Sequence, residues 1–268
     1  MKTLNWKEIG AITDFAYFHD FYQALDTLEM LAADENWKYA DMNGRRNQNN
    51  PILENYIHHT FKRLRDEYML ADDAERDEII YIDENIACFN VGLYTKNYNI
   101  IYAVFRPAKK ETDRKPFTFS SFEQQSSKKL ESIRTLPRRA NYFTDISELI
   151  YDSTLGLRAN IEHILEENID RFPENLRDNP MLATLFSGAI TMAKKRVAAN
   201  YRVAVPTYYR GAICLMLPIC LTSPNATDLA LAIQRNDGFY VAKTVLTLDM
   251  AYNDARLIAK PDNDWLVP

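Results

Sequence analysis

The sequence contains little glycine. Only 7 of its 268 residues are glycine, and the two that lie closest in the chain are Gly188 and Gly211. A dinucleotide-binding fingerprint, a P-loop and a nucleophile elbow each require glycines within a few residues of one another. The sequence therefore excludes these three kinds of site.

Cysteine is also rare, and long apolar runs are missing. The 3 cysteines lie inside apolar segments and form no close pair, which predicts core thiols in a reducing compartment. The longest charge-free apolar stretch, 211–227, is broken by two prolines, whereas a membrane-spanning helix needs about 20 apolar residues. The N-terminus lacks the apolar segment of a signal peptide. We therefore expect a cytoplasmic protein with no membrane partner.

The composition is that of an ordinary globular protein, with 47% hydrophobic and 26% charged residues. Apolar residues recur at helical spacing in several segments. The predicted helices lie after Asp20, from Pro51 onward, between residues 145 and 169, and between residues 180 and 200. Runs rich in β-branched and aromatic residues predict strands at 79–82, 86–94, 100–105, 117–122, 212–221, 228–234 and 239–248.

The order of these segments predicts the fold class. Helices and hairpins are grouped in blocks and do not alternate, which is typical of an α+β protein. We expect an antiparallel sheet of about six strands covered by helices. Because both halves of the chain depend on strands, we predict a single domain over residues 1–268. A basic, polar excursion at about 106–140 interrupts it, with ten basic and four acidic residues.

A second basic region contains no acidic residue. From Asn179 to Thr227 neither Asp nor Glu occurs, although the chain as a whole has a net charge of -5. The basic residues and tyrosines of this region are Lys194, Lys195, Arg196, Arg202, Arg210, Tyr201, Tyr208 and Tyr209. Lysine and arginine bind phosphates, and aromatic rings stack on unpaired bases, so the pattern predicts a surface for single-stranded RNA. The alternative is that the cations complement the end of their own helix and that the basic loop is merely solvated.

A set of polar side chains follows the last predicted strand. If the segment 249–258 forms a helix, Asp249, Asn253 and Arg256 stand at i, i+4 and i+7 on one side of it. An acid, an amide and a guanidinium grouped in this way can hold a ribose, a phosphate or a base edge. Two alternatives are structural: Asp249 caps the helix while Arg256 forms an ion pair, or Asn253-Asp254 is a hairpin turn that separates the three side chains.

The histidines predict no metal site. His58 and Glu54 are four residues apart, as in some metal sites, but no cysteine or second histidine completes the set, since His59 points about 100° away. If the protein is instead an enzyme that cleaves phosphodiester or nucleotide bonds, Asp249 acts as a base or as a ligand of a divalent metal, and His58 assists. Otherwise His58 is an ordinary hydrogen-bonded histidine.

Several motifs resemble a known family. They are FNVGL at 89–93, LPICL at 217–221, LTLDMAYNDARL at 246–257, PILENY at 51–56, and the closing Pro261, Trp265 and Leu266. Together they are similar to an uncharacterised bacterial family catalogued as domain of unknown function 3825, and the likeness covers nearly the whole chain. Val91 stands where the pattern has threonine, and Asp254 where it has a second asparagine, so the resemblance implies no shared polar role at these two positions.

The resemblance implies an RNA-related role, such as RNA processing or defence, because members of this family commonly stand beside RNA-binding modules. With the charge pattern, it predicts a protein that binds RNA or a nucleotide-like ligand through Asp249, Asn253, Arg256 and the second basic region. The alternatives are the metal-dependent enzyme and a structural or partner-binding subunit. No cofactor is expected, except a divalent metal if the protein is the enzyme.

Overall fold

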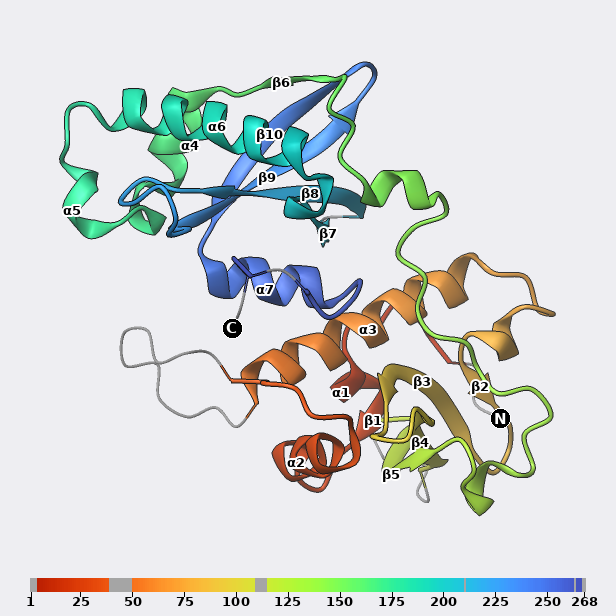
Figure 1. The fold of residues 1–268 in the computed structure, drawn as a ribbon. Helices are drawn as coiled ribbons and strands as arrows, with labels where there is room; N and C mark the ends of the chain where they lie inside the picture. The colour runs from red at the N-terminus through yellow and green to blue at the C-terminus, as the bar shows by residue number, and fades with distance from the viewer. Residues whose placement is uncertain (1–3, 39–49, 109–114, 210, 263, 267–268) are drawn as a thin grey trace. The chain divides into compact units, whose positions relative to one another are not determined.

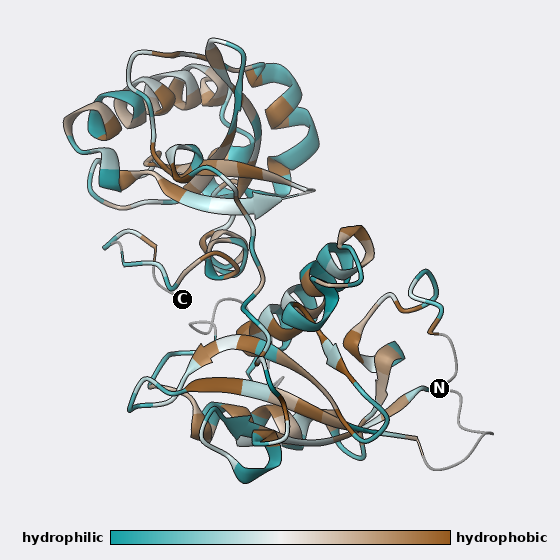
Figure 2. Cartoon of the chain, turned by 90° about the vertical axis from the view of Figure 1, so that its right-hand side faces the viewer, coloured by the Kyte–Doolittle hydropathy of each residue, from teal (hydrophilic) through white to brown (hydrophobic). Residues whose placement is uncertain are grey.

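The computed structural model describes residues 4–38, 50–108, 115–209, 211–262 and 264–266. The chain divides into two compact units, Met1–Asn141 and Tyr142–Pro268, called the first and the second unit below (Figure 1). Each unit contains a five-stranded sheet of its own. In both units the central strands are mainly hydrophobic, whereas the helices mix hydrophilic and hydrophobic residues (Figure 2).

The first unit combines its sheet with helices. The strands are β1 (Ala16–Tyr17), β2 (Tyr81–Ile82), β3 (Ala87–Tyr94), β4 (Ile100–Pro107) and β5 (Phe117–Gln124). Their order is β1-β5-β4-β3-β2, and all pairs are antiparallel except β1–β5. The helices are α1 (Ile12–Phe15), α2 (Phe21–Leu31) and α3 (Pro51–Leu70), with short 3₁₀ turns η1 (Arg76–Glu78) and η2 (Lys128–Leu130).

Local signals fix where the helices of the first unit begin. The side chain of Asp20 accepts a hydrogen bond of 3.0 Å from the backbone N–H of Gln23 and so caps α2. Pro51 occupies the start of α3, where its missing N–H costs no helical hydrogen bond. The predicted helices after Asp20 and from Pro51 are therefore confirmed.

Four phenylalanines form the centre of the first unit. Phe15 of α1, Phe61 of α3, Phe89 of β3 and Phe105 of β4 are completely buried. The ring centroids of Phe15 lie 5.2 Å from those of both Phe61 and Phe105, and Phe89 lies 5.6 Å from both of the same two rings. The four rings thus close a cycle that packs α1 and α3 against the sheet, with contacts in the range where aromatic pairs attract.

A glycine interrupts β3. The register of β3 and β4 shifts between Asn90 and Tyr94, and Gly92 has a φ of 75°, a conformation that side chains strongly disfavour. A Cβ at Gly92 would also collide with the hydroxyl of Tyr56. The buried Asn90 holds this irregularity, because its Oδ1 accepts from Gly92 N at 2.8 Å and its Nδ2 donates to Pro137 O at 3.3 Å. Glycine is therefore required at this position.

A buried carboxylate holds the last residues of the first unit. Glu67 of α3 is only 9% exposed. It accepts hydrogen bonds from Arg63 Nε at 3.1 Å, from Arg138 Nη1 at 2.6 Å and from the backbone N–H of Asn141 at 2.7 Å. Three donors, two of them charged, offset the cost of burying the carboxylate. The segment 138–141 is thereby fixed to α3.

The second unit has a sheet with helices on both faces. Its strands are β6 (Gly156–Arg158), β7 (Val205–Tyr209), β8 (Ala212–Ile219), β9 (Leu229–Asn236) and β10 (Phe239–Leu246), in the order β6-β10-β9-β8-β7. All pairs are antiparallel except β6–β10. The helices are α4 (Ile161–Asn168), α5 (Glu174–Arg177), α6 (Leu182–Ala199) and α7 (Leu248–Arg256), with 3₁₀ turns η3 (Ile146–Leu149), η4 (Ile169–Arg171) and η5 (Tyr201–Val203).

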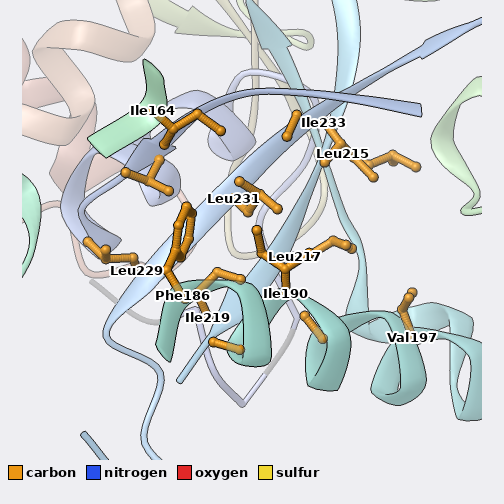
Figure 3. Packing of buried hydrophobic residues seen from close by; sticks show 14 of the residues in the cluster. Ile164, Phe186, Ile190, Val197, Leu215, Leu217, Ile219, Leu229, Leu231 and Ile233 are labelled. Carbon is orange, nitrogen blue, oxygen red and sulfur yellow. The ribbon is translucent and has the colours of Figure 1, made fainter. Parts of the chain in front are cut away.

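One face of this sheet packs against α4 and α6. Phe186 and Ile190 of α6 belong to the same buried cluster as Leu217 of β8 and Leu231 of β9, and Figure 3 shows these side chains together. Neighbouring residues in a strand point to opposite faces. The intervening strand residues therefore point to the other face, where α7 lies against β7, β9 and β10 (Figure 1).

The structure confirms the α+β class, but it contains two five-stranded sheets rather than one of about six strands. The meander of β2, β3 and β4, the strand β5 within the excursion, and the strands β8, β9 and β10 agree with the predicted ranges. The segment 145–169 is not one helix. Its first half contains the 3₁₀ turn η3 and the strand β6, and only α4 is α-helical; Leu157 packs against the core from β6.

The prediction of a single domain stays a prediction, since it concerns whether the two compact units unfold together. No helix in the described part of the chain is long and apolar enough to cross a membrane. Cys88 and Cys214 are buried as expected of core thiols, whereas Cys220 is half-buried.

Candidate nucleic-acid interface

The polar set near the carboxyl end lies on a helix, as predicted. Thr247 begins α7: its hydroxyl accepts from the backbone N–H of Met250 at 3.4 Å. Asp249 therefore lies in the first turn and is not the cap, and the alternative of a hairpin turn at Asn253-Asp254 is wrong. Asp249, Asn253 and Arg256 share one side of α7 because they are spaced at i, i+4 and i+7.

These three side chains differ in their access to solvent. Asp249 and Asn253 are half-buried, and Arg256 is buried with 8% of its surface exposed. All three take part in interactions within the structure. Ala251 and Ala255, on the opposite side of α7, are also buried, and their small side chains allow α7 to approach the sheet closely. Arg256 is thus a fixed guanidinium rather than a mobile surface cation.

Sequence reasoning missed an unusual titratable group, Asp254. It lies in α7, and burial raises its pKa to about 6. Both Asp254 and Lys243 act electrostatically on the thiol of Cys214 in β8, whose pKa burial raises to about 11. No local pattern in the sequence signals this burial, because Asp254 directly precedes Ala255 and so points about 100° away from it around the helix.

The cations of the second basic region are distributed over α6 and η5. Lys194 and Lys195 near the end of α6 are exposed, and so is Arg202 in η5. Arg196 is half-buried, and its NH1 lies 3.2 Å from Sγ of Cys220. Arg210 lies outside the described residues. The exposed cations therefore belong to two consecutive elements that pack on each other.

The tyrosines of this region have different surroundings. Tyr201 in η5 is 55% exposed, and Tyr209 at the end of β7 is 40% exposed. Tyr208 is half-buried and packs edge to face against Tyr142, with 4.9 Å between the ring centroids. Tyr201, which adjoins Arg202, is thus the most exposed of these three rings.

The structure does not bring the two predicted sets together. Lys194 and Lys195 belong to α6 on one face of the sheet, and Asp249, Asn253 and Arg256 belong to α7 on the other. The turn η5 lies between the end of α6 and β7. Trp265, which follows α7 in the chain, donates a hydrogen bond from Nε1 to the backbone oxygen of Val203 in η5 at 2.9 Å. The sheet therefore separates most of the basic surface from the polar set of α7.

His58 belongs to the first unit, whereas Asp249 belongs to the second. The imidazole of His58 is half-buried on α3 and lies 5.2 Å from the ring of Phe21. Burial lowers its pKa, against opposing effects of Glu54 and Asp14. His58 is therefore neutral at pH 7 and packs against an aromatic ring.

The basic excursion uses several of its cations internally. Arg138 binds Glu67, Lys129 binds Glu123 at 2.5 Å, and Lys115 donates to the backbone carbonyl of Thr13. Arg106, Lys128, Arg134 and Arg139 are exposed, and Lys109, Lys110 and Arg114 lie outside the described residues. The excursion is thus partly a structural element of the first unit.

Residues 28–265 match the model of the family described as a domain of unknown function (DUF3825). The chain belongs to this family. No curated protein matches the chain, and neither does any solved structure. The DUF3825 match spans both units.

The family motifs fall at the structural features described above. FNVGL forms most of β3 and contains the irregularity at Gly92, LPICL ends β8, and LTLDMAYNDARL joins β10 to α7. Among the described residues of this DUF3825 chain, no group of three or more His, Cys, Asp or Glu side chains is arranged to hold a metal ion. The predicted catalytic roles of Asp249 and His58, and the cofactor prediction, stay predictions.

Proposed function

We propose that the second unit binds single-stranded RNA, or a ligand with the same phosphate and base chemistry, through the surface formed by the end of α6 and η5. The observation that carries the proposal is the absence of carboxylates from Asn179 to Thr227. This stretch forms α6, η5, β7 and β8. Its exposed cations therefore have no acidic neighbour within their own segment, and they create a local positive field on an acidic protein.

The roles follow from exposure. Lys194, Lys195 and Arg202 contact phosphates, because exposed cations bind a nucleic acid backbone without sequence preference. Tyr201 stacks on a base. Arg196 and Tyr208 are half-buried and so are less accessible to a ligand than these side chains. The polar set of α7 lies on the other face of the sheet, so the proposal does not depend on it.

The test is a titration of a fluorescein-labelled oligouridine by fluorescence anisotropy at several salt concentrations. We expect the triple variant Lys194→Ala/Lys195→Ala/Arg202→Ala to bind at least about tenfold more weakly. The slope of log K against log salt should also fall by about 2, since each lost phosphate contact on a single strand contributes about 0.7. Tyr201→Ala should weaken binding while leaving the salt slope unchanged.

The matched control removes the same charge elsewhere. Lys7, Lys62 and Lys260 are exposed and lie outside the acid-free stretch, so the triple alanine variant at these positions should retain the affinity and the salt slope. If both triple variants lose the same affinity, the effect comes from net charge alone, which contradicts the proposal. Shortening of the oligomer that requires a divalent metal and is lost in Asp249→Asn would select the enzyme alternative.

A further inference from the structure

The segment after α7 is attached to the turn η5. Trp265 donates a hydrogen bond from Nε1 to the backbone oxygen of Val203, the last residue of η5, at 2.9 Å. Leu266, the next residue, is only 1% exposed, so the chain is packed directly after the indole. The two partners of this hydrogen bond are 62 residues apart in the chain. A residue distant in sequence therefore holds one end of η5.

Local hydrogen bonds hold the other end of η5. The side chain of Asn200 accepts from the backbone N–H of Arg202 at 3.1 Å, and the N–H of Val203 donates to the backbone oxygen of Asn200 at 3.0 Å. A 3₁₀ turn has poorer hydrogen-bond geometry than an α-helix, and the carbonyl at its end has no donor within the turn. The indole of Trp265 supplies that donor.

The directions of the side chains in η5 follow from its geometry. A 3₁₀ helix has three residues per turn, so successive side chains point about 120° apart. Val203 packs against the core of the second unit. The two remaining directions belong to Tyr201 and Arg202, and both side chains are exposed. A contact that fixes the backbone of Val203 therefore also fixes where the ring of Tyr201 and the guanidinium of Arg202 point.

We infer that Trp265 is a positioning residue for RNA binding, and that its hydrogen bond to Val203 holds η5 in the rotation that presents the ring and the guanidinium of this turn to the ligand. This role rests on the proposed function and deepens it, because it makes the segment after α7 part of the control of the RNA surface. Trp265 acts through η5 and need not touch the RNA. A turn that is already ordered loses less conformational entropy on binding, so its contacts contribute more to the affinity.

Trp265→Phe tests the hydrogen bond, because phenylalanine keeps an aromatic ring but has no N–H to donate. Binding of a fluorescein-labelled oligouridine, measured by fluorescence anisotropy, should weaken by about threefold to tenfold, the range that the loss of one hydrogen bond produces. The slope of log K against log salt should fall by no more than about 0.7, since Arg202 is the one cation that η5 carries. Lys194 and Lys195 on α6 should keep their phosphate contacts.

Two backgrounds separate positioning from a general loss of structure. In Tyr201→Ala/Arg202→Ala at low salt, Trp265→Phe should weaken binding no further, because η5 then lacks both side chains that the indole positions. In Lys194→Ala/Lys195→Ala, Trp265→Phe should weaken binding by the same factor as in the unchanged protein. A residue that acts only on overall stability would lower the affinity equally in both backgrounds, and that result would overturn the inference.

Trp265→His separates the donor from the size of the indole. Both side chains attach a five-membered ring to Cβ, and the imidazole can carry an N–H at the place of indole Nε1. At pH 8 a histidine with an ordinary pKa of about 6.5 is neutral and adds no charge. Trp265→His should then bind RNA more tightly than Trp265→Phe. Equal weakening in both variants would assign the effect to the lost volume, which contradicts the positioning role.

The matched control is a tryptophan of the first unit. Trp6 packs against the rings of Phe15 and Tyr68, and Trp6→Phe should keep the affinity and the salt slope of the unchanged protein. Circular dichroism should show that Trp265→Phe is folded under the assay conditions. An unfolded variant would make Trp265 a residue of the core and end the proposal.

The same titrations distinguish failure of this role from failure of the proposed function. If the unchanged protein does not bind the oligomer even at low salt, where electrostatic binding is strongest, the proposed function fails and the role of Trp265 fails with it. If the protein binds and the triple variant at the RNA surface weakens the binding, but Trp265→Phe does not, only the role of Trp265 fails.

Discussion

Replacing Asp254 by asparagine should stabilise the protein at neutral pH. The carboxyl of Asp254 in α7 is half-buried, and burial raises its pKa from 3.8 to about 6. No hydrogen bond or ion pair of this side chain is found among the described residues. At pH 7 the folded protein therefore contains a carboxylate in a poorly hydrated place, and an amide of the same size removes that cost.

The sign of the pH dependence follows from the raised pKa. The folded state holds its proton more tightly than the unfolded state, so the contribution of Asp254 is most favourable below about pH 4 and is lost as the pH rises through about 6. One pKa unit corresponds to about 1.4 kcal/mol, so the full difference between 3.8 and about 6 corresponds to at most about 3 kcal/mol. Water that reaches the partly exposed carboxylate reduces this difference. We therefore expect Asp254→Asn to raise the free energy of unfolding at pH 7 by about 1–3 kcal/mol.

The measurement is urea unfolding of the unchanged protein and Asp254→Asn between pH 4 and pH 8, followed by circular dichroism. The difference in free energy of unfolding should be small at pH 4 and should reach its full value above pH 7. Cys214 does not contribute in this window, since burial keeps its pKa near 11. Asp237→Asn in the exposed turn between β9 and β10 is the control and should show no such trend. A difference that is the same at pH 4 and pH 8, or an Asp254→Asn variant that is no more stable at pH 7, would refute the reasoning.

Two further substitutions test other parts of the structure. Gly92→Ala should destabilise the protein by about 2 kcal/mol or more, because it combines a disfavoured φ with a collision against Tyr56. Gly238 has a φ of 79° and open space around the position of a Cβ, so Gly238→Ala should lose only the stability that the disfavoured φ costs. Equal losses of stability in the two variants, measured by thermal unfolding, would show that the collision with Tyr56 contributes nothing. Arg256→Ala should cost about 1.5–3 kcal/mol in urea unfolding, since it removes a buried charged donor. Arg256→Ala should leave RNA affinity nearly unchanged. A loss of RNA affinity without a loss of stability would show that α7 belongs to the binding site.

Much of the fold follows from periodicity alone. Helix α3 was predictable because a proline starts it and one apolar face runs along it, and the hairpins were predictable because β-branched runs alternate with polar turns. The short edge strands β6 and β7 were not, since their apolar residues are too few to distinguish an extended segment from a helical one. A parallel edge such as β6 against β10 depends on contacts distant in sequence, which no local pattern encodes.

The candidate site was predictable only in part. The spacing of Asp249, Asn253 and Arg256 predicted a shared side of a helix, but the helix is capped by Thr247 and not by Asp249. The spacing did not reveal that Arg256 is buried, nor that the sheet stands between α7 and α6. Which face of a sheet a helix covers is set by packing of the whole unit, so charge patterns show which residues are available but not which of them meet.

The hydrogen bonds of Glu67 determine where the first unit can be cut from the rest of the chain. A fragment that ends with its last strand at Gln124 would lack Arg138 and the backbone donor of Asn141, and a carboxylate with most of its partners removed is strongly destabilising in a protein interior. Dissection upstream of residue 138 should therefore yield a less stable product. An N-terminal piece that extends through Asn141 keeps this anchor intact and is the shortest one worth preparing for isolated study.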